Sequence, residues 1–82
     1  MTQVLSTTPQ LGQILRSARR ARKLTQGQAA TRLGLSQSRL SALELVPKAI
    51  SAEQLLALVN LYGLELIIQS KDAAPASEKT DW

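Results

Sequence analysis

Residues 25–44 constrain the fold of this 82-residue chain more than any other stretch. Thr25, with Gln28 three residues later, forms a capping box that predicts the start of a helix. Gly34 suits a helix end, where a residue at positive φ is favoured, and Ser36 is a good N-cap for a second helix. Two short helices joined by a turn that contains glycine form a helix-turn-helix motif.

The second helix of this motif has two different faces. At 100° per residue, Leu40 and Leu43 lie together on one side and point toward the core. The other side is mostly small or polar and carries Gln37, Ser38, Ser41, Ala42 and Leu45. Short side chains permit close approach to a major groove, and a glutamine amide can pair with adenine at two atoms. We therefore predict base contacts at Gln37, Ser38, Ser41 and Ala42.

The residues around this face suit phosphate groups instead. Arg39 lies off the groove-facing arc, so it is expected to meet a phosphate rather than a base. The free N–H groups in the first turn of a helix also attract anions. The predicted phosphate contacts are Thr25, Gln26, Arg39 and Lys48.

Charge is unevenly distributed along the chain. Residues 1–48 hold eight lysines and arginines against one acidic residue, whereas residues 49–82 hold two against five. A basic half that carries a helix-turn-helix indicates a polyanion partner. An ordinary solvated basic face is the alternative.

Composition excludes several kinds of protein. The chain has no histidine and no cysteine, which removes the commonest general base, the commonest metal ligand and any disulfide. We expect no enzymatic activity, no metal and no cofactor. No apolar run approaches the ~20 residues of a membrane span, and the start does not resemble a signal peptide. We expect no membrane association and a cytoplasmic, nucleoid-associated protein of prokaryotic type.

The N-terminal part predicts an arm followed by a helix. Residues 1–8 are polar and short of core-forming side chains, so they are expected to be an arm. Pro9 suits the first turn of a helix that is capped by Thr7 or Thr8 and runs to about Lys23.

The part after the motif predicts a loop and a final helix. Residues 45–50 are expected to be a loop because Pro47 blocks a continuing helix. Ser51 caps a helix that ends at Gly63, and this helix is apolar almost all round, which suggests a partner chain. The DNA-binding domain is predicted to span residues 9–62.

Residues 63–70 predict a dimerisation strand. The segment 64–69 alternates partly at period two and is rich in β-branched residues. A lone strand leaves its backbone unpaired, and its most economical partner is its own copy across a two-fold axis. The predicted dimer contacts are Leu58, Tyr62, Leu64, Leu66, Ile67 and Ile68. The alternative is a last helical turn followed by a loop.

Residues 71–82 predict a flexible acidic tail, because they contain too few apolar residues to fold alone. The tail ends in Trp82, the only tryptophan. A single large aromatic residue on a polar tether is the composition of a docking anchor. The alternative is a terminal residue without a role.

Together these features resemble the lambda-repressor-like, XRE (Cro/CI-type) helix-turn-helix family over roughly residues 10–62. The family spacing holds throughout at Leu11, Gly12, Leu15, Arg16, Arg19, Leu24, Thr25, Gln26, Ala30, Gly34, Leu35, Ser36, Leu40, Ser41 and Glu44. The resemblance implies a mainly α helix-turn-helix domain of four to five helices, to which residues 64–69 are expected to add one C-terminal strand pairing across a homodimer. It also implies DNA contacts at Gln26, Gln37 and Ser38, with Ala42 near a thymine methyl group.

The same resemblance implies an ion pair between Arg19 and Glu44 that joins the first helix to the end of the second motif helix. Arg19 is therefore interpreted as structural rather than as a DNA contact. The chain departs from the family pattern in two places. Gly27 replaces a usual helix former, and Leu45-Val46-Pro47 replaces a polar turn that contains glycine.

The second half resembles HipB-type antitoxins. The shared layout is a leucine-rich helix, a strand that opens with Leu64-Glu65-Leu66, and an Ala/Pro/Ser tail that ends in Trp82. This resemblance implies a homodimer that binds a palindromic operator, represses its own operon and holds a HipA-type serine/threonine kinase toxin, with Trp82 as the toxin-docking residue. The alternatives are a stand-alone XRE-family repressor and an interaction module that does not bind DNA. The basic first half disfavours the interaction module.

Overall fold

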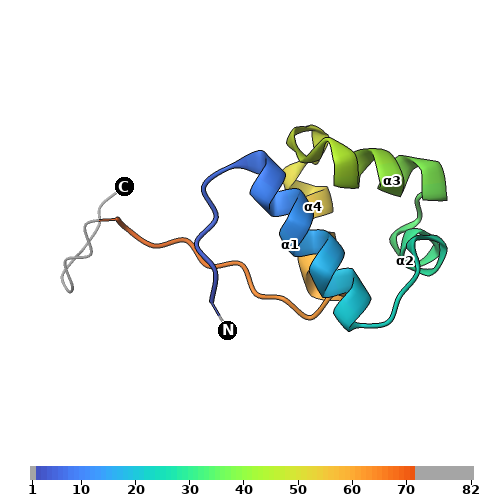
Figure 1. The fold of residues 1–82 in the computed structure, drawn as a ribbon, viewed down its shortest axis with the longest axis horizontal. Coiled ribbons are helices and arrows are strands. Elements are labelled where there is room, and N and C mark those ends of the chain that lie inside the picture. Colours follow the sequence, from blue (N-terminus) through green and yellow to red (C-terminus); the bar gives the residue numbers. More distant parts are fainter. Residues whose placement is uncertain (1, 72–82) are drawn as a thin grey trace.

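The computed structural model describes residues 2–71, and their fold is mainly helical, with a helix-turn-helix at its centre (Figure 1). The described elements are α1 (Thr8–Ala21), α2 (Gln26–Leu33), α3 (Gln37–Leu45), the 3-10 helix η1 (Pro47–Ala49) and α4 (Ala52–Leu61). The predicted mainly α fold with a helix-turn-helix is confirmed. The loop predicted at 45–50 contains η1, which the sequence reasoning missed.

Each α-helix begins at a hydroxyl side chain that accepts a backbone N–H. These N-caps are Thr7, Thr25, Ser36 and Ser51, and the boxes of Thr25 with Gln28 and of Ser51 with Gln54 are both complete. Gly34 ends α2 with φ at 72° in the left-handed region, where a glycine carries no steric cost. A capping side chain contributes about 1 kcal/mol to helix stability, so the helix starts are fixed locally by the sequence.

The core lies where α1, α2, α3 and α4 meet. Its buried members are Leu15, Ala29, Ala30, Leu40, Leu58 and Tyr62. Two of these, Leu58 and Tyr62, were predicted to be dimer contacts, but in the single chain both side chains are already buried, each only 3% exposed. They are four residues apart, so they lie on one face of α4 and its C-cap and turn together into the chain's own core.

A close crossing joins α1 to the end of α3. A Cβ atom at Gly12 would lie 2.8 Å from the Glu44 carbonyl oxygen and 2.9 Å from Cγ of Pro47. The crossing is held by Arg16, whose Nη1 donates to the same Glu44 carbonyl at 2.9 Å. Only a residue without a side chain fits at this position without a shift of the backbone.

The described residues contain no β-strand. Leu64 is still tied to α4, because its N–H donates to the Val59 carbonyl at 2.9 Å. Residues 65–71 then leave the helices as an irregular segment. The strand predicted at 64–69 is therefore not formed within a single chain. Its pairing with a second copy remains a proposal.

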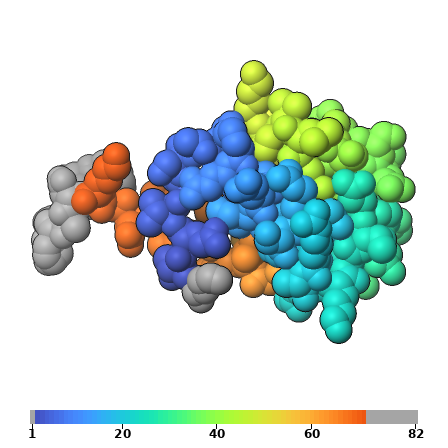
Figure 2. All heavy atoms as spheres, viewed as in Figure 1, coloured from blue at the N-terminus to red at the C-terminus, as the bar shows by residue number. Residues whose placement is uncertain are grey.

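The two ends of the described chain lie at the same end of the molecule. Arm residues 2–7 and residues 65–71 gather at one end of the long axis, and α2 with α3 form the other (Figures 1 and 2). The arm is fixed by Gln10, whose amide donates to the Val4 carbonyl at 2.7 Å and accepts from the Ser6 N–H at 2.8 Å. Residues 72–82, with the predicted docking residue Trp82, lie outside the described residues.

Candidate nucleic-acid interface

The two faces of α3 differ in the structure as they do in the sequence. Its buried residues are Leu40, Leu43 and Glu44. Of the predicted base contacts, Gln37, Ser38 and Ala42 are exposed and Ser41 is half-buried. The structure therefore places all four on the outer side of α3, opposite the core, where a partner could reach them.

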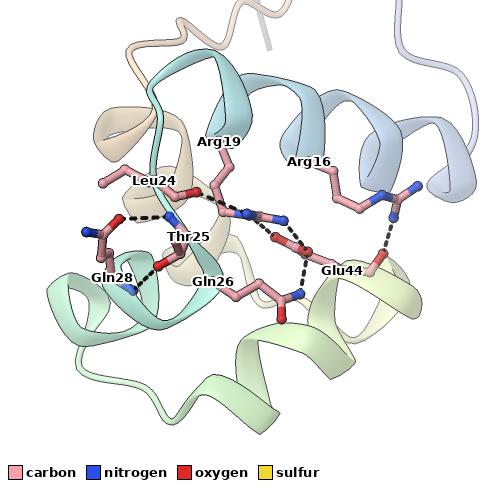
Figure 3. Close-up of polar contacts among 7 residues, drawn as sticks. All are labelled: Arg16, Arg19, Leu24, Thr25, Gln26, Gln28 and Glu44. Atoms are coloured by element: carbon pink, nitrogen blue, oxygen red, sulfur yellow. Dashed lines mark hydrogen bonds and ion pairs between the residues drawn. The ribbon is translucent and has the colours of Figure 1, made fainter.

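A buried network holds α3 against α1 and α2 (Figure 3). Arg19 donates from Nε to Oε2 of Glu44 at 2.8 Å and from Nη2 to Oε1 at 3.3 Å. Arg19 also donates from Nη1 to the Leu24 carbonyl at 3.0 Å. The Arg19 and Glu44 side chains are both almost fully buried. The ion pair that the family resemblance implied is thus a structural link between α1 and the end of α3.

Gln26 belongs to this network as well. Its Nε2 donates to Oε1 of Glu44 at 2.9 Å, across 18 residues of chain, and Figure 3 shows its amide turned toward the carboxylate. Gln26 was predicted to contact phosphate. That contact stays a prediction. In the free protein the Gln26 amide joins the first turn of α2 to α3. Sequence reasoning missed this bond because the family pattern paired Glu44 with Arg19 alone.

Tyr62, a member of the apolar core, is close enough to the network for Glu44 and Arg19 to affect its pKa. Its hydroxyl is buried and has no hydrogen-bond partner among the described residues. The pKa of Tyr62 is raised to about 12, mainly by burial and also by the Glu44 carboxylate, while Arg19 acts to lower it. The hydroxyl therefore stays protonated at every pH where the protein is expected to work.

The starts of α2 and α3 lie close together. A Cβ at Gly27 would be 3.7 Å from Oε1 of Gln37, so the Gln37 amide lies over the first turn of α2. The Thr25 hydroxyl accepts the Gln28 N–H as the N-cap of α2. A predicted base contact and the N–H groups predicted for phosphate therefore share one edge of the molecule.

The surface of the helix-turn-helix region is basic. Within residues 8–49 the single acidic residue, Glu44, is buried in the network. Six basic side chains in this range are exposed, namely Arg20, Arg22, Lys23, Arg32, Arg39 and Lys48. The helix-turn-helix region therefore exposes cations and no carboxylate, with Arg39 on α3 itself and Lys48 on η1, which is the electrostatic requirement for a polyanion.

Comparison with known proteins gives one family. The helix-turn-helix domain matches residues 10–66, which include all four α-helices. No curated protein and no solved structure matches the chain significantly. None of the helices within residues 2–71 has the length and apolar character needed to cross a membrane.

Proposed function

Because the chain belongs to the helix-turn-helix domain family, we propose that it is a sequence-specific DNA-binding repressor that uses α3 to recognise its operator. One observation carries this proposal. The outer side of α3 is small and mostly polar, and residues 8–49, which contain it, expose six basic side chains and no carboxylate. An enzyme is not proposed, because the chain lacks histidine and cysteine.

The residues divide into base contacts and phosphate contacts. Gln37 pairs with an adenine through its amide, Ser38 and Ser41 bond to neighbouring base edges, and Ala42 meets a thymine methyl group. Arg39, Lys48 and the N–H groups that begin α2 hold the phosphates on either side. Gln26 contributes through Glu44, which fixes the start of α2 relative to α3.

The repressor is proposed to be a homodimer on a palindromic operator. Leu66, Ile67 and Ile68 are exposed apolar residues in a row, and their segment, residues 65–71, lies toward the end of the molecule opposite α2 and α3 (Figure 1). Pairing of residues 64–69 with the same segment of a second chain would cover these side chains. Two α3 helices would then be available, one for each half-site of the operator.

We propose further that this cytoplasmic repressor acts as an antitoxin of HipB type. The support is the layout of the second half, with a leucine-rich helix, an apolar segment at 64–69 and a tail that ends in Trp82. In this proposal Trp82 docks onto a HipA-type kinase toxin. The competing candidate is a stand-alone repressor in which the tail has no partner.

Base recognition is tested with a duplex selected from a random library. Gln37→Ala is expected to weaken binding to that duplex by about 1–3 kcal/mol and to relax base choice at one position per half-site. Gln13→Ala is the matched control, because Gln13 is an exposed glutamine of α1. Equal weakening on selected and scrambled duplexes would show that Gln37 does not contact bases. Failure to select any duplex would overturn the proposed function.

The antitoxin role is tested by capture of native partners with the full chain and with a chain that lacks Trp82. A kinase-like partner that is retained only by the full chain supports the proposal, provided that both chains bind the selected duplex equally. Equal capture by both chains would remove Trp82 as the anchor. Absence of any kinase-like partner would favour the stand-alone repressor.

A further inference from the structure

Leu45 is the one large apolar side chain on the outer side of α3, and it is 75% exposed. At 100° per residue it lies about 80° from Gln37, between Ser41 and Ser38. The buried residues of α3 occupy the opposite half of the helix. Leu45 is therefore central to the outer side rather than at its margin.

The whole outer side of α3 is short enough to fit one groove. Nine residues at 1.5 Å each give a helix about 13 Å long, and the major groove is about 12 Å wide. Gln37 and Ser38 begin this surface, and Leu45 ends it about two turns later. A helix that lies in the groove thus brings Leu45 to base level together with the predicted polar contacts.

The surroundings of Leu45 favour DNA over an apolar protein surface. Arg16 donates to the carbonyl of the preceding residue, Glu44, at 2.9 Å, and Lys48 follows three residues later on η1. No exposed carboxylate occurs within residues 8–49. An apolar side chain between cations matches the groove wall, where apolar base groups lie between two rows of phosphates.

We propose that Leu45 recognises the 5-methyl group of a thymine in each operator half-site. This inference rests on the proposed DNA binding and adds to it a base preference and the residue responsible. The thymine methyl is the apolar group that base edges present in the major groove. The departure from the family pattern at 45–47 thus gives this chain an apolar contact at the end of its recognition surface.

The test removes one methyl group at a time. In the duplex selected by the unmodified chain, each thymine is replaced in turn by deoxyuridine, and Kd is measured for the unmodified chain and for Leu45→Ala. Burial of one methyl group corresponds to about a four-fold change in Kd. For the unmodified chain, we expect this loss of affinity when one particular thymine of each half-site is replaced. For Leu45→Ala, we expect replacement of the same thymine to leave Kd unchanged.

Two further variants make the result specific. Leu45→Met keeps an apolar side chain and is expected to keep the methyl dependence. Leu56→Ala removes another exposed leucine, which lies on α4 and is 52% exposed, and it is expected to behave as the unmodified chain. Circular dichroism of all variants checks that the helices are intact.

The outcomes separate the two proposals. If replacing each thymine lowers the affinity of the unmodified chain and of Leu45→Ala by the same factor, Leu45 contacts no methyl group and the inference is wrong. A methyl whose removal weakens both chains equally is contacted by another residue, such as Ala42. If the unmodified chain selects no duplex, the proposed function fails, and this inference fails with it.

Discussion

The α4 helix and the segment that follows it are both apolar in sequence, yet they lie in opposite environments. Leu58 and Tyr62 are each 3% exposed, whereas Ile67 and Ile68 are 66% and 88% exposed. The first pair has helical spacing and finds partners in α1, α2 and α3. Ile67 and Ile68 have no packing partners in the core that the described residues form. The apolar character of a side chain thus predicts that it will be buried, but not whether its own chain or a partner chain buries it.

The helical body and the segment that follows it also differ in their internal hydrogen-bonded structure. In the helical body, the Glu44 carboxylate is buried and accepts from Arg19 and Gln26. Residues 65–71 form neither a helix nor a strand. We infer that α1–α4 are stable as one chain and that the following segment depends on a second copy.

The largest effect is expected for Glu44→Ala. The change leaves the Arg19 guanidinium buried without its partner, which costs about 3–5 kcal/mol. Urea denaturation followed by circular dichroism measures the loss. The double variant Arg19→Met/Glu44→Leu removes both charges and should recover most of the stability. A loss below about 1 kcal/mol for Glu44→Ala would show that the helical body does not depend on this network.

The second prediction compares two glycines. Gly12→Ala should cost about 1–3 kcal/mol, because the new Cβ would lie 2.8 Å from the Glu44 carbonyl oxygen and α1 must shift away from α3. Gly27→Ala meets only ordinary contacts, at 3.7 and 3.9 Å, and should stabilise α2 by about 0.5–1 kcal/mol. Thermal unfolding of both variants gives the comparison. Equal effects would contradict the close crossing.

The third prediction concerns pH. The pKa of Tyr62 rises from 10.0 in the unfolded chain to about 12 in the folded protein. The folded state therefore keeps a proton that the unfolded state loses, and stability present below pH 10 falls as pH rises toward 12. The expected loss is about 2 kcal/mol. Denaturant midpoints from pH 8 to 12 measure it.

Tyr62→Phe is the control for that titration. It should remove this part of the alkaline loss. At pH 7 it should be neutral or slightly stabilising, because the lost hydroxyl has no partner among the described residues. Marked destabilisation at pH 7 would show that the hydroxyl is hydrogen-bonded in solution.

The smallest effect on the stability of a single chain is expected for Ile67→Lys/Ile68→Lys. Both side chains are exposed, so at low concentration the free energy of unfolding should change by no more than about 0.5 kcal/mol. Sedimentation velocity should show loss of the dimer. Val4→Lys alters an exposed apolar residue of the arm and should leave the dimer intact. A dimer that survives the double change would contradict the pairing at 64–69.

The parts of the fold that depend on near neighbours in sequence could be predicted. The N-caps at Thr25, Ser36 and Ser51 and the left-handed Gly34 follow from residues within one turn of each other. The burial of Tyr62 could not be predicted, because a helix that is apolar all round gives no direction to the core.

The interface shows the same limit. The outer side of α3 follows from helical geometry, so Gln37 and Ser38 could be placed without the structure. The bond from Gln26 to Glu44 could not, because it depends on how α2 packs on α3. The cover of residues 64–69 depends on a second chain, which a single sequence does not describe.

The most direct test of the central claim is the affinity of the full chain for the selected operator and for a scrambled duplex, measured across a range of salt concentrations. If α3 and its basic surroundings bind DNA, the logarithm of the association constant should fall linearly with the logarithm of salt, with a slope of about −0.9 per phosphate contact. The selected operator should stay the tighter ligand throughout. A flat salt dependence, or equal affinity for both duplexes, would contradict the claim.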